Sequence, residues 1–182
     1  MRRLALVGLA SALLFVLPAG AEWEADPGDK VQLKAMSALA DFRERLPRTE
    51  QYFEQAYGYA IFPSVTRVGL GFGGAYGKGI VVETDRTVGN TKYWQFTSGI
   101  QAGARNFSMI IFFKDKAALE YYQSGDIQFM GQAGLAFARS GVAGTPAYND
   151  GVAVVTMTRV GLMGEFTVSG AKFTYQPLAA AE

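Results

Sequence analysis

The residue types that most often carry enzyme chemistry are missing from this sequence. It contains no histidine and no cysteine, which removes the usual general base, the thiol nucleophile and the commonest zinc ligands. Ser-His-Asp and Cys-His sites are therefore excluded. Carboxylates, lysine, tyrosine and serine remain, but no two carboxylates have a spacing that indicates an acid–base pair. The sequence predicts a protein with no catalytic residues, no metal site and no cofactor.

Three basic residues are candidates for binding a lipid phosphate group. Arg67 and Arg159 occupy equivalent places in a short repeat, Thr-Arg-Val-Gly-Leu, at 66–70 and 158–162. Arginine suits bidentate contact with phosphate, and two arginines at equivalent places would form a basic rim. Lys78 lies in a glycine-rich stretch, where we expect its side chain to reach solvent. The alternative for all three is a solvated or ion-paired surface residue.

The stretch 69–82, GLGFGGAYGKGIVV, raises the question of why glycine is so dense there. Its glycines fall mostly at odd positions and its large side chains at even ones, which is the period of a β-strand. Because glycine within a strand costs about 0.5–1 kcal/mol relative to alanine, something must offset that loss. We expect close backbone packing or a tight bend, with ligand contact as the alternative. A phosphate-binding loop is not expected, because no helix follows the G-x-G-x-x-G pattern.

Two helices are predicted before this strand. Residues 31–46 carry an apolar stripe of helical period, with Asp29 as the predicted N-cap and Pro47 just beyond the end. A second, short helix is predicted over 49–57. Most aromatic residues of the front half are expected in the core rather than in a lipid-contacting patch. They are Phe42, Tyr52, Phe53, Tyr57, Tyr59, Phe72 and Tyr76.

Strands predominate from residue 59 to 175, followed by a frayed tail at 177–182. The predicted strands are 59–65, 68–83, 93–113, 127–139, 152–159, 162–169 and 172–175, with a hairpin connection at 85–92 and a loop at 140–150. Asp115 is expected to cap a short helix that runs to Gln123. The predicted class is α+β: N-terminal helices followed by a strongly curved, glycine-rich antiparallel sheet or half-barrel with one short inserted helix.

Several of these segments, taken in order, resemble the SYLF domain family. They are the glycine block 58–82, the helix start 111–119, the stop at 122–125, and 150–155 with Gly161-Leu-Met163. The resemblance covers about 29–175 and implies a non-catalytic lipid-binding module. Eukaryotic members are associated with phosphoinositide membranes, largely through a basic N-terminal segment, and fungal members with actin.

The resemblance adds Lys34 and Arg43, on the leading helix, to the candidate lipid-binding residues Arg67, Lys78 and Arg159. This chain departs from the eukaryotic pattern, however, because Asp29, Asp41 and Glu44 offset much of the positive charge of that helix. A basic helix surface is therefore less pronounced here than in those relatives.

The first 21 residues are predicted to be a secretory signal peptide. Arg2 and Arg3 precede an apolar segment at 4–17, and Ala19-Gly-Ala21 is a small-x-small cleavage site. The apolar segment is shorter than the roughly 20 residues that span a bilayer. We therefore expect a single domain, 22–182, that is periplasmic or secreted after cleavage near Ala21. Export makes actin an unexpected partner.

The predicted function is a lipid-binding module of the cell envelope that contacts anionic head groups, an apolar groove, or both. The alternative is a structural or interaction protein of the envelope that docks a protein partner through its curved sheet. An enzyme acting through lysine, tyrosine or carboxylates is a third and disfavoured class. With 17 basic and 16 acidic residues, the chain has no bulk charge that indicates nucleic acid.

Overall fold

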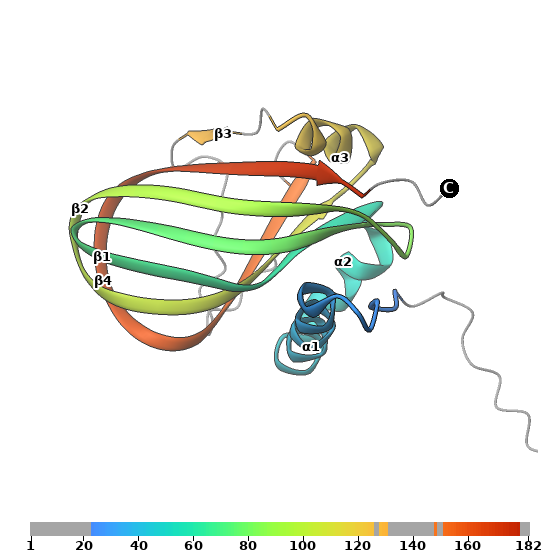
Figure 1. The fold of residues 1–182 in the computed structure, drawn as a ribbon, viewed down its shortest axis with the longest axis horizontal. Coiled ribbons are helices and arrows are strands. Elements are labelled where there is room, and N and C mark those ends of the chain that lie inside the picture. The colour runs from blue at the N-terminus through green and yellow to red at the C-terminus, as the bar shows by residue number, and fades with distance from the viewer. Residues whose placement is uncertain (1–22, 126–127, 131–147, 149–150, 179–182) are drawn as a thin grey trace, which may run out of the picture.

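A computed structural model describes residues 23–125, 128–130, 148 and 151–178, with the backbone alone at 99–101, 128–130 and 159–170. The predicted signal peptide, most of the predicted strand at 127–139 and loop at 140–150, and residues 179–182 of the tail lie outside the described residues. The elements are α1 (Lys30–Arg45), the 3-10 helix η1 (Pro47–Thr49), α2 (Glu50–Gln55), β1 (Gly58–Glu83), β2 (Arg86–Phe113), α3 (Lys116–Gln123), β3 (Gln128–Met130) and β4 (Val152–Pro177). The α+β class is confirmed, with helices before an antiparallel sheet and a short helix inserted into it (Figure 1).

The two main helices begin where the sequence predicts. The Asp29 carboxylate accepts hydrogen bonds from the backbone N–H groups of Val31 (2.7 Å) and Gln32 (3.2 Å), so it caps α1. The Asp115 carboxylate likewise accepts from the N–H of Ala118 at 2.9 Å and caps α3. The second helix is shorter than predicted, because Ala56 is already extended after α2.

The sheet has the order β1-β2-β4-β3, and all its pairs are antiparallel. Its three long strands contain 26, 28 and 26 residues. The breaks predicted near 66–67, 160–161 and 170–171 are wrong, because β1 and β4 run through them. The hairpin connection is not 85–92 but the two residues Thr84 and Asp85, both with positive φ. The polar residues that follow belong to β2, where one side of the strand faces solvent.

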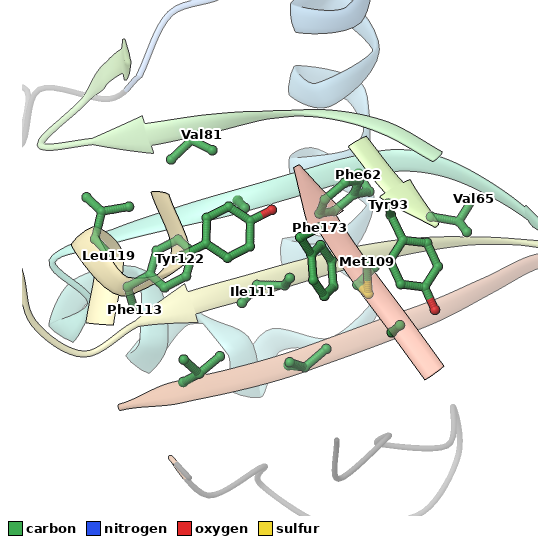
Figure 2. Packing of buried hydrophobic residues seen from close by; sticks show 14 of the residues in the cluster. Phe62, Val65, Val81, Tyr93, Met109, Ile111, Phe113, Leu119, Tyr122 and Phe173 are labelled. Carbon is green, nitrogen blue, oxygen red and sulfur yellow. The ribbon is translucent and has the colours of Figure 1, made fainter. Parts of the chain in front are cut away.

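Each long strand bends back on itself at the end of the molecule away from the helices (Figure 1). We call residues 58–66, 105–113 and 152–158 the first half of the sheet, and residues 72–83, 86–98 and 168–177 the second half. One hydrophobic core lies between the two halves (Figure 2). In this core the centre of the Phe62 ring, from the first half, lies 6.1 Å from the centre of the Tyr93 ring and 5.8 Å from that of the Phe173 ring, both from the second half. Helix α3 adds Tyr122, whose ring lies 4.9 Å from that of Phe113.

Two glycines of the dense stretch, Gly77 and Gly79, lie where the two halves of β1 cross. A Cβ atom at Gly77 would stand 2.7 Å from the Val65 side chain, and one at Gly79 would overlap the Ile61 carbonyl group. Gly71 has a φ of +71° at the bend, a conformation that glycine adopts without steric cost. At Gly77 and Gly79 the bare side of the strand therefore faces inward and permits close packing, whereas Gly71 is exposed at the bend.

A second cluster of buried residues joins the helices to the outer side of the first half. Phe42 of α1 and Tyr52 of α2 pack there with Ile61, Ile110 and Phe112. The Tyr52 and Phe112 rings are 5.3 Å apart. None of the helices in the described part of the chain has the length and apolar character needed to span a bilayer.

Candidate functional site: an amphipathic outer face

Large apolar side chains are exposed at the bend and on the outer side of the second half. Leu70 is 82 % exposed, Phe72 69 % and Phe96 67 %, while Val68 and Trp94 are about half exposed. We call these five residues the apolar patch. Exposed apolar residues are ordinary when scattered singly, whereas contiguous apolar patches are typical of interaction surfaces. These five residues are therefore a candidate site.

The strand register explains why these side chains are uncovered. Residues that pair directly across an antiparallel sheet share one side of it. Phe96 pairs with Gly74 on β1 and with Gly170 on β4, so neither neighbour has a side chain that could cover its ring. Along β2 the alternate residues Gln95 and Thr97 point inward and are buried. The strand thus places polar residues inside and aromatic residues outside.

From Trp94, the patch residue farthest from the bend, the same side of the sheet becomes aromatic and basic. Trp94 pairs with Tyr76 on one side and Lys172 on the other, and the Tyr76 and Trp94 rings are 4.4 Å apart. In the next row Lys92 pairs with Lys78 and Thr174. All three lysines are exposed. We call this side of the sheet, with the apolar patch, Tyr76 and the three lysines, the outer face. Moving away from the bend, the outer face is therefore apolar first, then aromatic, then basic.

A pocket of about 230 Å³ lies beside Lys78 and Lys92, where the first turn of α1 meets the sheet. Its lining includes Val31 of α1 and, from the sheet, Lys78, Asn90, Lys92, Thr174 and Gln176. None of the described residues that line it is acidic. The pocket thus combines two ammonium groups with neutral amide and hydroxyl groups, which together can bind an anion.

Among the predicted lipid-binding residues whose side chains the structure describes, only Lys78 lies on this face. Arg67 is 4 % exposed and lies within the sheet, where it pairs with Arg105 of β2. The side chain of Arg159 lies outside the described part of the structure. The two copies of the repeat lie on either side of β2, since Arg105 pairs with Arg67 in one copy and with Gly161 in the other.

Lys34 and Arg43 lie on α1 rather than on the outer face of the second half. Lys34 is exposed. The Nε atom of Arg43 is 3.4 Å from Oε2 of Glu50, and its guanidinium group lies 5.0 Å from the centre of the Phe53 ring. Arg43 therefore joins α1 to α2.

The sequence did not predict that Lys92, Lys172, Trp94 and Phe96 belong to the site. The alternation in Tyr93-Trp-Gln-Phe-Thr97 gives the period of a strand, but hydrophobicity favours placing Trp94 and Phe96 inward, which is the reverse of the observed orientation. The expectation that Phe72 belongs to the core is wrong for the same reason. Phe42 and Tyr52 are buried as expected, and Phe53, Tyr57 and Tyr59 are partly buried against the core.

The shifted pKa values of the described residues belong to tyrosines packed in or against the core. Burial raises the pKa of Tyr122, although its hydrogen bond with Thr91 acts in the opposite direction. The hydrogen bond that the Tyr57 hydroxyl donates to Glu83, at 2.7 Å, raises the pKa of Tyr57. These groups belong to the packing in and around the core and do not line the pocket.

Comparison with known proteins gives one informative similarity. No family model matches the sequence. Beta cell expansion factor A from Aeromonas veronii is 27% identical over 146 residues, which cover 79% of this chain and 55% of that protein. The chain therefore spans about half the length of this curated relative. Together with the segments that resemble SYLF domains, this similarity suggests that the chain is SYLF-like.

Proposed function

We propose that this chain is a non-catalytic lipid-binding protein of the cell envelope that contacts a membrane surface with its outer face. The observation that carries the proposal is the order of side chains along that face. Leu70, Phe72 and Phe96 are apolar and strongly exposed, Trp94 and Tyr76 follow, and the lysines come last. A membrane has the same order in depth, with hydrocarbon inside, an interfacial region that favours Trp and Tyr, and head groups outside.

The proposal also orients the protein. The bend of the sheet would enter the interfacial region, while Lys78, Lys92 and Lys172 would remain at the level of the head groups. A basic residue near an anionic leaflet contributes about 1 kcal/mol, and long lysine stems keep their ammonium groups in water beside apolar surroundings. Helix α1 would face away from the bilayer, so this chain would not depend on a basic leading helix. Localisation in the envelope follows from the predicted signal peptide and belongs to the same proposal.

Vesicle sedimentation of the chain 22–182 tests the proposal. We expect the wild-type chain to sediment with vesicles of phosphatidylcholine and phosphatidylglycerol, and less strongly at high salt, because salt screens exposed charges. The double substitution Phe72→Ser with Phe96→Ser should weaken binding by at least about tenfold, or roughly 1.4 kcal/mol. Both residues are exposed, so this change should leave the stability of the fold nearly unaltered.

Tyr121→Ser is the matched control, because Tyr121 is an exposed aromatic residue on α3, outside the outer face. It should bind vesicles as the wild type does. Wild-type protein that does not bind vesicles, or a Phe72/Phe96 variant that binds them equally well, would contradict the proposal. A protein partner docked on the sheet would then be the better account of the exposed apolar patch.

A further inference from the structure

The pocket beside α1 lies on the outer face, two rows from Phe96. Lys92 lines the pocket, and Phe96 is four residues further along β2. At about 3.3 Å per strand residue, their α-carbons are about 13 Å apart. This distance is less than half of the roughly 30 Å thickness of a bilayer's hydrocarbon core. A molecule whose polar end sits at Lys92 can therefore reach the apolar patch with its other end.

The charges around the pocket favour an anion. Lys78 and Lys92 pair directly across β1 and β2, and like charges in that arrangement repel each other. Neither lysine forms an ion pair with a residue that the structure describes. A bound anion would remove the repulsion between the two ammonium groups. The repulsion between the two lysines thus destabilises the fold locally, and a bound anion would offset this effect.

The remaining lining groups indicate what kind of anion fits. Asn90 and Gln176 carry amides and Thr174 carries a hydroxyl, and these groups donate hydrogen bonds to oxygen atoms without adding charge. Lysine is a common point-charge ligand of phosphate. The volume of about 230 Å³ is below the roughly 300–1,000 Å³ of most sites for drug-sized molecules. It suits a phosphate ester with a small polar group and is too small to enclose acyl chains.

We propose that this pocket binds the phosphate group of an anionic phospholipid head group, while the acyl chains of that lipid run along the outer face toward the apolar patch. The inference rests on the proposed membrane function and adds a specific head-group site to it. A free phosphate ester offers the same chemistry, so the test has to separate the two sources.

The first arm of the test uses inorganic phosphate and the amide NMR spectrum of the chain 22–182. Added phosphate, compared with chloride at equal ionic strength, should shift the amide signals of Gly79, Asn90, Thr91 and Thr174 in a saturable way. The double substitution Lys78→Gln with Lys92→Gln should abolish these shifts. Lys114→Gln with Lys116→Gln removes the same charge at the start of α3 and should retain them. Absent shifts, or shifts lost equally in both pairs, would overturn the proposal.

The second arm uses vesicles of phosphatidylcholine with and without phosphatidylglycerol. Lys78→Gln with Lys92→Gln should weaken binding to the anionic vesicles by about thirtyfold, as expected from two interfacial lysines. Binding to pure phosphatidylcholine should change no more than about twofold, because the apolar patch is intact. The Lys114/Lys116 control should also stay within about twofold of wild type on both vesicles. A loss of phosphate shifts with no greater loss of anionic vesicle binding than in this control would mean an adventitious ion only, and would overturn the head-group assignment.

The two proposals fail in distinguishable ways. If wild-type protein binds anionic vesicles through Phe72 and Phe96 but phosphate shifts no pocket amide, the head-group site is wrong and the membrane function stands. If phosphate shifts the pocket amides but wild-type protein binds no vesicles, the pocket takes a free phosphate ester. That result would overturn both the membrane function and the lipid head group as the ligand.

Discussion

Gly79 lies directly against the backbone carbonyl group of Ile61, a residue of the same strand. The contact joins the two halves of β1 where they cross, and it leaves no room for a side chain at position 79. Val65 and Gly77 form a similar contact nearby, with 2.7 Å between the Val65 methyl carbon and a Cβ placed at Gly77. The crossing of the strand over itself is therefore possible because glycine recurs on one of its sides.

Alanine at position 79 should be among the most destabilising single substitutions in the described part of the chain. The atom it meets belongs to the backbone, so the clash cannot be relieved by moving a flexible side chain. We expect Gly79→Ala to lower the free energy of unfolding by more than about 3 kcal/mol, the upper end of the usual overpacking range. Urea denaturation followed by circular dichroism measures this change.

Gly71 provides the comparison, because its requirement is conformational rather than steric. A Cβ at position 71 meets no heavy atom within 4 Å, but φ is +71°. Gly71→Ala should cost about 1–2 kcal/mol, and Gly71→Asn should cost less because asparagine tolerates this conformation. At position 79 the order should be reversed, since asparagine is larger. The same order at both positions would contradict the distinction between the two glycines.

Replacing Thr84 should stabilise the β1–β2 hairpin. Thr84 and Asp85 form its two-residue turn with φ of 44° and 62°, and a β-branched residue is poorly suited to positive φ. Thr84→Asn should therefore raise the free energy of unfolding by about 1 kcal/mol. Thr158→Asn, on an exposed position of β4, is the control and should be slightly destabilising because asparagine disfavours strands. Thermal denaturation of both variants makes the comparison.

Tyr122 should make the protein less stable at high pH. Burial raises its pKa above the value of 10.0 that it has when exposed. Above about pH 10 the unfolded chain releases this proton while the folded chain retains it, so unfolding becomes more favourable as pH rises. The stabilisation is complete below the unfolded pKa and is lost as pH rises toward the folded pKa. The slope for one tyrosine is about 1.4 kcal/mol per pH unit.

Tyr122→Phe separates this titration from the packing of the ring. The Tyr122 and Thr91 hydroxyl groups are 2.6 Å apart, and Thr91 donates to the backbone oxygen of Thr174 at 2.9 Å. The substitution should cost about 1 kcal/mol near neutral pH through the lost hydrogen bond. Between pH 10 and 11 its stability should fall less steeply than that of wild type. Parallel pH profiles in urea denaturation would show that Tyr122 does not titrate on unfolding as expected.

Trp94 should report membrane contact by fluorescence. The chain has two tryptophans: Trp23 is buried and its indole N–H donates to the Thr87 hydroxyl at 2.9 Å, whereas Trp94 is about half exposed. Anionic vesicles should shift the emission to shorter wavelengths because Trp94 leaves water. Trp23→Phe should retain the shift and Trp94→Phe should lose it. The opposite pattern would indicate that the N-terminal segment, not the outer face, contacts lipid.

Local signals in the sequence predicted the parts of the fold that depend on local chemistry. Asp29 and Asp115 cap helices as expected, and the alternating glycines of 69–82 lie in a strand that is closely packed on its bare side at Gly77 and Gly79. Strand ends were less predictable, since the polar residues after Asp85 resemble a loop and yet continue β2. Their backbone groups are held by pairing with β1 and β4, which are partners distant in sequence.

The candidate site depended on which side of β2 faces the core, and the sequence does not determine this. Gln95 and Thr97 are inside and Trp94 and Phe96 outside, the reverse of what hydrophobicity favours. Tyr93 decides the orientation, because its ring packs on Phe62 and Phe173 in the core. Lys92 and Lys172 could not be assigned to the site from the sequence, because only the strand register places them beside Lys78 and Trp94.

The continuity of the long strands through the bend has a consequence for how the protein opens. Strands β1, β2 and β4 each belong to both halves of the sheet. Neither half can therefore unfold without disrupting the three strands that it shares with the other half. Native-state hydrogen exchange should therefore show one cooperative unit spanning both halves, with slow exchange at Ile61, Ile80, Tyr93 and Ile111 alike. A membrane contact made by the apolar patch at the bend would thus be held in place by the stability of the entire domain.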